Sequence, residues 1–145
     1  MLLYKALLLV HITSFALWLG VVTAALLVIR TLESRLTDSA NFRAGDEQLL
    51  RGYIRKEVKL VDVVFLLLIF SGILLAQFFI GWTTWVIIKI GLLVAQFIAT
   101  MGYIRLYIRP ITYPAPPNVY RRWYGLVAVS LTFFAVILLV VFFGR

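Results

Sequence analysis

The chain has 145 residues, of which 63% are hydrophobic and only 14% are charged, and its net charge is +8. This composition excludes an ordinary soluble domain and is typical of an integral membrane protein. The absence of cysteine excludes disulfides, thiolate catalysis, cysteine-ligated zinc and iron–sulfur clusters. The basic residues stand at the ends of apolar runs, where they indicate membrane orientation and contact with anionic lipid rather than nucleic-acid binding.

Four apolar runs predict four transmembrane helices, at about residues 3–29, 60–80, 85–104 and 124–143. Each run is close to the ~20 residues that a helix needs to cross the hydrocarbon core. The first run is too long for a signal peptide and no clear cleavage site follows it, so we expect it to be retained. The predicted fold is all-α: a single domain over residues 1–145, built as an up-down-up-down four-helix membrane bundle.

The two longer connections between these runs differ in character. In the first, residues 31–36 are expected to continue helix one beyond the membrane, residues 41–45 to form a turn, and Asp46 to cap a second helix that starts at Glu47. The second connection carries all four prolines and cannot be helical throughout. Asn118 is the predicted N-cap of the fourth helix.

The basic residues predict the orientation. Eleven of them stand in the two longer connections: Arg30, Arg35, Arg43, Arg51, Arg55, Lys56, Lys59, Arg105, Arg109, Arg121 and Arg122. The opposite side has only Lys5 and Arg145, at the termini. The positive-inside rule therefore places both basic loops in the cytoplasm and both termini outside, in a bacterial-type inner membrane.

His11 is the only histidine of the chain, and it lies within the first apolar run. An ionisable side chain in hydrocarbon is costly, so it is by default a functional candidate. Helical spacing predicts one polar and aromatic face around it, formed by Tyr4, Leu8, Ser14, Phe15 and Trp18. Two interpretations stay open: a buried histidine bonded to a serine or a carbonyl, or a ligand for haem or a metal.

The other intramembrane polar residues are few. At 1.5 Å per residue, Gln77 and Lys89 reach about the depth of the histidine, whereas Gln96 lies nearer the middle. Lys89 either snorkels to the outer headgroups or belongs to a site. Gln77 and Gln96 are more often interhelical hydrogen-bonding residues than ligands. Asp62 is expected to form an ion pair at the inner boundary with Lys59 or a neighbouring arginine.

Three short motifs stand in order along residues 4–109. They are His11 followed by Trp18-Leu19-Gly20, then Arg55-Lys56-Glu57 before a helix bearing Ser71-Gly72, then Trp85 followed by Lys89. In this order they resemble the first three helices of the HemJ and CopD-like superfamily of four-helix membrane proteins. HemJ-type members are linked to protoporphyrinogen IX oxidation and bind haem b, and CopD-like members are associated with copper handling.

This resemblance implies haem b bound by His11 as the proximal metal ligand, with Trp18 as a wall of the pocket and Gln77 nearby. Lys89 would then neutralise a propionate or a substrate carboxylate. A copper site is disfavoured, because copper prefers several imidazole or sulfur ligands. HemJ proteins carry a second histidine where this chain has Met101. A haem would therefore be five-coordinate, or two chains of a homodimer would share it through His11.

The predicted function is thus a haem b or porphyrin-binding membrane protein that serves oxidation or electron transfer with a redox partner. The alternative is a non-enzymatic membrane protein, either an assembly partner or a component of small-solute or metal transport, in which His11 is structural. Whether the protein is an enzyme stays open at this point.

Overall fold

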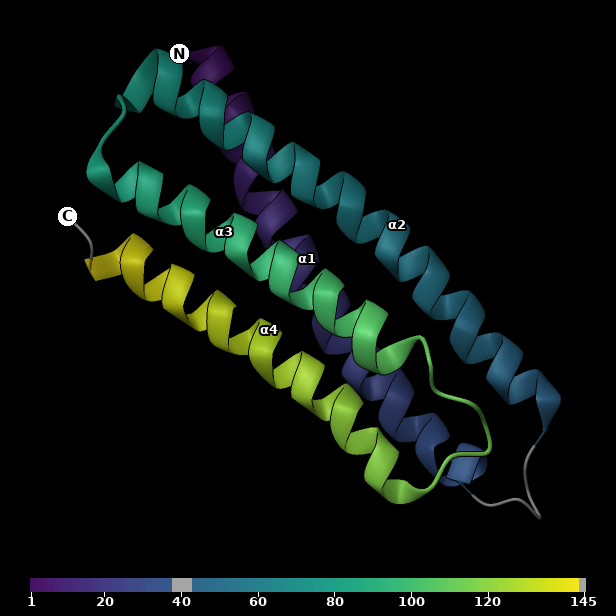
Figure 1. Ribbon diagram of the computed structural model, residues 1–145. Coiled ribbons are helices and arrows are strands. Elements are labelled where there is room, and N and C mark those ends of the chain that lie inside the picture. Colours follow the sequence, from purple (N-terminus) through teal and green to yellow (C-terminus); the bar gives the residue numbers. More distant parts are fainter. Residues whose placement is uncertain (38–42, 144–145) are drawn as a thin grey trace.

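The computed structural model describes residues 1–37 and 43–143 (Figure 1). Its four long helices are α1 (Leu2–Thr37), α2 (Ala44–Leu75), α3 (Thr84–Tyr103) and α4 (Pro117–Phe143). α2 and α3 each end in a π-helical turn, η1 (Ala76–Ile80) and η2 (Ile104–Ile108). The described part of the chain contains no strand, so the predicted all-α four-helix bundle is confirmed.

All four helices are long and apolar enough to cross a membrane. Large apolar side chains cover the outside of the bundle, among them Leu66, Phe70, Ile98 and Phe142. Apolar patches of this extent are rare on soluble monomers. The protein is therefore a multi-pass membrane protein whose helices contact the lipid bilayer.

Two helix starts differ from the prediction. α2 begins at Ala44 and α4 begins at Pro117, so Asp46 and Asn118 lie in first turns rather than at N-cap positions. Proline suits the first helical position because its missing N–H would have no partner there. A carboxylate in the first turn is favoured by the helix dipole, which explains Asp46. α1 continues to Thr37, beyond the predicted membrane span, as expected. Of the predicted turn at residues 41–45, residues 41–42 lie outside the described residues, and the prediction is wrong for Ala44 and Gly45, which belong to α2.

A tight turn after η1 sends the chain back along the bundle. Gly81 has a φ of 87°, a conformation that favours glycine because it has no Cβ. Thr83 then caps α3, since its hydroxyl accepts a hydrogen bond from the backbone N–H of Val86 at 3.3 Å.

α1 is the helix at which the packing converges, because it packs closely against both α2 and α4. α3 packs mainly on α4. α2 and α3 are not a closely packed pair, but the stacked rings of Phe65 and Phe97, 4.3 Å apart, bridge them. A buried cluster in the middle of the bundle, which we call the membrane core, consists of Trp18, Val61, Val64, Leu68, Leu93, Phe134 and Ile137.

A second buried cluster lies where α1 leads into α2 and α3 into α4, and we call this end of the bundle the basic end. The cluster consists of Ile29, Leu32, Leu36, Leu50, Ile108, Ile111, Ala115, Tyr120 and Trp123. The α3–α4 connection crosses α1 here, and the backbone N–H of Ala115 donates to the carbonyl of Leu36 at 3.0 Å. Figure 1 shows the start of α1 and the end of α4 at the opposite end of the bundle.

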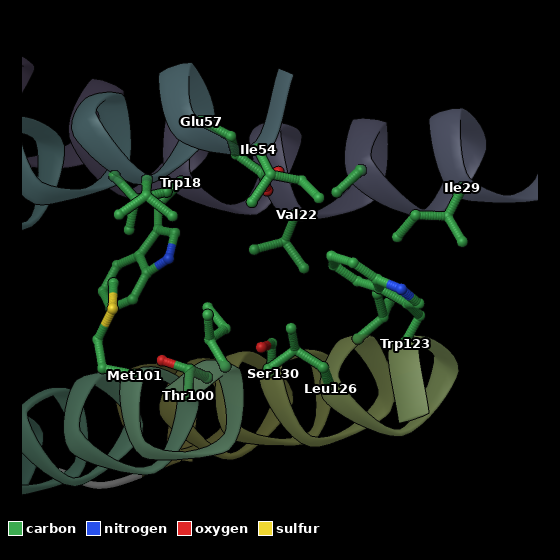
Figure 2. Close-up of a pocket in the computed structure, with 15 residues that line it drawn as sticks. Trp18, Val22, Ile29, Ile54, Glu57, Thr100, Met101, Trp123, Leu126 and Ser130 are labelled. Carbon is green, nitrogen blue, oxygen red and sulfur yellow. The ribbon is translucent and has the colours of Figure 1, made fainter. Parts of the chain in front are cut away.

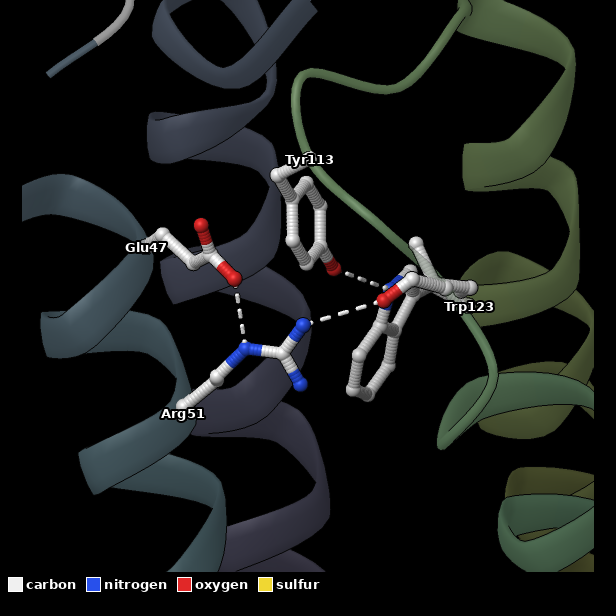
Figure 3. A network of polar contacts seen from close by, with 5 residues as sticks. Glu47, Arg51, Tyr113 and Trp123 are labelled. Atoms are coloured by element: carbon white, nitrogen blue, oxygen red, sulfur yellow. Dashed lines mark hydrogen bonds and ion pairs between the residues drawn. The ribbon is translucent and has the colours of Figure 1, made fainter. Parts of the chain in front are cut away.

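Arg51 ties this connection to α2 (Figure 3). Its Nε donates to Glu47 at 2.7 Å, and its Nη2 donates to the carbonyl oxygen of Ile111 at 3.0 Å. The guanidinium also lies 5.6 Å from the centre of the Tyr113 ring, whose hydroxyl accepts a hydrogen bond from the indole of Trp123. Burial raises the pKa of Tyr113, so its phenol stays protonated and neutral in this network.

Candidate functional site

The side chain of His11 on α1 points toward α2, where the imidazole contacts the helical turn from Leu68 to Ser71. Its Nδ1 lies 3.1 Å from the carbonyl oxygen of Leu68 and 3.2 Å from the hydroxyl oxygen of Ser71. A carbonyl can only accept, so the network assigns the ring proton to Nδ1. In the neutral ring Nε2 then carries the lone pair. Metal-binding histidines are held in this way, with one nitrogen donating to a carbonyl and the other left for the metal.

Ser71 and Gly72 are the residues of α2 against which this imidazole packs. The Ser71 hydroxyl is near the carbonyls of Leu67 and Leu68, at 2.6 and 3.1 Å, as is usual for serine inside a helix. A Cβ added to Gly72 would stand 3.1 Å from Cε1 of His11, which is tighter than an ordinary contact. Two of the three sequence motifs, the one with His11 and the one with Ser71-Gly72, are thus brought together by the fold.

We expect Gly72→Ala to displace the imidazole by a few tenths of an ångström and to weaken its bond to Leu68. The predicted loss is about 1 kcal/mol of unfolding free energy, the usual net contribution of one hydrogen bond. Thermal unfolding in detergent, followed by circular dichroism, measures it. Gly91→Ala on α3 is the matched control, because its added Cβ meets no atom within 4 Å. Equal stability of the two variants would show that the imidazole of His11 does not need the space left by the missing Cβ of Gly72.

Lys89 lies on α3 and is half-buried. Its side chain makes no hydrogen bond or ion pair with any described residue. Gln77 is exposed in η1, and its amide oxygen accepts a hydrogen bond from the indole of Trp82 at 2.9 Å. The hydrogen bonds and ion pairs of the described residues therefore join neither Lys89 nor Gln77 to His11.

Gln96 is fully buried, and its amide nitrogen donates at 3.5 Å to the carbonyl of Ser130 on α4. This confirms the predicted interhelical role for Gln96, whereas the bond of Gln77 stays within the turn between α2 and α3. The predicted ion pair of Asp62 is wrong, because no described basic side chain pairs with its carboxylate. Asp62 is only partly buried.

Trp18 is 2% exposed and belongs to the membrane core. Its indole packs edge-on against Phe65 and Phe134, with ring centres 5.6 and 5.2 Å away. It also lines a cavity, but this cavity does not include His11, so the predicted role of Trp18 as a wall of a porphyrin pocket at His11 stays a prediction. Trp18 stands about two helical turns from the histidine, roughly 10 Å along α1.

The cavity has a volume of about 60 Å³ and is lined by residues of all four helices (Figure 2). Apolar side chains dominate its wall, together with the indoles of Trp18 and Trp123. Three residues with oxygen-bearing side chains line it, Glu57, Thr100 and Ser130. Sequence reasoning named Glu57 only within the Arg55-Lys56-Glu57 motif and gave it no role of its own, because the charged stretch from Arg55 to Lys59 indicates only an interface.

A second hollow is an open groove of about 750 Å³ on the outer face of α1 and α2. α1 contributes small and apolar residues to it, and α2 contributes the more polar end. Its lining residues are Ile12, Thr13, Ala16, Leu17, Gly20, Val21, Ala24, Tyr53, Lys56, Glu57 and Leu60.

The donor chemistry at His11 fits a haem iron, because Nε2 is the unprotonated nitrogen and makes no hydrogen bond with the described residues. Neither hollow contains His11, however, and the cavity is far below the roughly 300–1,000 Å³ of a cofactor pocket. The described residues also contain no group of three or more histidine and acidic side chains that could hold a metal ion.

No protein-family model, curated protein or solved structure matches the chain. The residues of the chain itself therefore carry the functional argument.

Proposed function

We propose that the protein binds haem b or a related porphyrin through Nε2 of His11. The observation that supports this is the bond from Nδ1 to the Leu68 carbonyl, which orients the ring and leaves Nε2 as the donor. Haem would supply one-electron chemistry for oxidation or electron transfer. Lys89, half-buried on α3, would neutralise a propionate or a substrate carboxylate. Binding requires side chains beside His11 to move apart, because neither hollow includes it.

The visible absorption spectrum tests this proposal. Protein purified from haem-replete cells should show a Soret band, and His11→Ala should lose the band while keeping its helical circular dichroism. A colourless wild-type protein would contradict the proposal. One haem per chain with a five-coordinate high-spin spectrum is expected. A low-spin bis-histidine spectrum with one haem per two chains would instead indicate a homodimer that shares the haem through His11, and a role in electron transfer.

Lys89→Met is expected to weaken porphyrin binding about tenfold, because a carboxylate in a low dielectric loses its counter-charge. The bundle should stay folded, since methionine suits apolar surroundings. A titration of the purified apoprotein with haemin, followed at the Soret band, measures the affinity. Lys5→Met is the control for loss of one positive charge at the same end of the bundle. Equal affinity of the Lys89→Met variant and the wild type would remove Lys89 from the site.

A second candidate function is a non-enzymatic assembly or transport component in which His11 is structural. It is favoured by the fact that both bonded neighbours of Nδ1, Leu68 and Ser71, lie on α2, so that the imidazole joins α1 to α2. Interhelical bonds of this kind contribute about 0.6–2 kcal/mol in membranes. Under this proposal His11→Ala lowers the thermal midpoint of a protein that is colourless from the start.

We further propose that the basic end faces the cytoplasm of a bacterial-type inner membrane and that both termini lie outside. Support comes from the eleven basic residues in or beside the two connections at that end, against Lys5 and Arg145 at the other. The natural chain has no cysteine, so Gly45→Cys gives a unique label. An impermeant maleimide should label it only in inverted vesicles. Labelling in intact spheroplasts would overturn the orientation.

A further inference from the structure

Glu57 is the one residue that lines both hollows, the internal cavity and the outer groove. It lies on α2, half-buried, and makes no hydrogen bond or ion pair with any described residue. A carboxylate set among apolar groups without a partner is costly. In a membrane helix such a group indicates a function and calls for a cationic partner.

The surroundings of Glu57 favour a cation. Among the described residues no basic side chain lines the cavity, and the indoles of Trp18 and Trp123 form part of its wall (Figure 2). Indole faces attract cations, most strongly when water is excluded. Lys56 is the only basic residue of the groove. It is exposed, so its ammonium can extend to the headgroups.

The volumes of the cavity and of the groove limit the size of the two parts of a ligand. The cavity of about 60 Å³ has room for a few waters or a small ammonium group. The groove of about 750 Å³ lies within the range of small-molecule sites, and its α1 side is apolar over Ile12 to Ala24 except for Thr13. The ligand thus combines a small charged head with an apolar body, and the two parts meet at Glu57.

We propose that Glu57 binds the ammonium group of an amphipathic amine whose apolar body lies in the groove between α1 and α2. The site is separate from His11 and is independent of haem binding. Its entrance is lateral, from the lipid, because the groove opens on the outer face of the bundle. This assigns a ligand class, lipophilic amines, to a part of the protein outside the His11 site.

Calorimetric titration of the protein in lipid nanodiscs tests the proposal, with octylamine as the charged probe and octanol as the neutral probe of equal length. Octylamine should bind about tenfold or more tightly than octanol. Glu57→Gln should abolish this difference. Asp62→Asn should preserve it, because Asp62 is a carboxylate of the same helix that lines neither hollow. Equal binding of the two probes to the wild type, or unchanged octylamine binding to Glu57→Gln, would overturn the charge pairing.

Gly20→Leu tests the groove independently of charge. A Cβ at Gly20 meets no atom within 4 Å, so a larger side chain can fill the groove without disturbing the bundle. Octylamine affinity should fall about tenfold. Gly91→Leu is the matched control, because Gly91 is equally unobstructed and lines neither hollow. If Gly20→Leu binds octylamine with wild-type affinity, the apolar chain of the amine does not lie in the groove. Octylamine should bind Lys56→Ala at least as tightly as the wild type, because the change removes a positive charge that repels the ammonium head. Loss of octylamine binding in Lys56→Ala would overturn the proposal.

Discussion

Replacing Trp18 with alanine is expected to destabilise the protein by about 3 kcal/mol, the low end of the range for a buried aromatic side chain. Trp18 is 2% exposed and joins rings from α2 and α4, so its removal leaves a hole in the membrane core. In a bilayer the hydrophobic transfer energy of the ring contributes little to this loss, because lipid tails are as apolar as the protein interior. The loss of van der Waals contacts remains. Chemical unfolding in mixed micelles, followed by circular dichroism, measures the change.

Trp85→Ala is the matched control, because Trp85 is 39% exposed and belongs to neither buried cluster. It should change the stability by no more than about 0.5 kcal/mol. Trp18→Phe should recover part of the loss, since a smaller ring still contacts Phe65 and Phe134. A Trp18→Ala variant as stable as Trp85→Ala would show that the ring cluster does not hold the helices together.

Arg51→Ala is expected to release the α3–α4 connection and to cost about 1–2 kcal/mol. The change leaves the Ile111 carbonyl without its donor and removes the cation from the Tyr113 ring. Bonds from charged donors contribute about 1.5–3 kcal/mol. The value is reduced here because the Arg51 side chain is 46% exposed, and solvent screens its pairing with Glu47. A spin label on Thr112→Cys, at an exposed position in the connection, should become more mobile.

Arg55→Ala separates this effect from loss of charge, because Arg55 is exposed one turn further along α2 and makes no bond to the connection. The label in Arg51→Lys should have a mobility between those of the wild type and Arg51→Ala. An ammonium keeps the charge but lacks the planar guanidinium that bonds to Glu47 and Ile111 together. If the label is equally mobile in Arg51→Ala and Arg55→Ala, Arg51 does not anchor the connection.

The amino-acid sequence alone predicted the four helices, because the length of each apolar run is set by the thickness of the hydrocarbon core rather than by any partner. It also placed His11 within an apolar run and all four prolines between the third and fourth runs, although Pro117 is the first residue of α4. Helix starts were less certain. Asp46 and Asn118 are good N-cap residues, but each lies one to three residues inside a helix that had already begun.

The partners of the polar groups could only come from the tertiary structure. Helical spacing put Ser14 on the face of His11, yet the serine beside the imidazole is Ser71 on α2. The four helices are apolar on several faces, so periodicity does not indicate which faces meet. The contact of Glu57 with the two hollows could not be predicted for the same reason. Its place among charged residues is a property of the sequence, whereas its position between the cavity and the groove arises only when the four helices pack around Trp18.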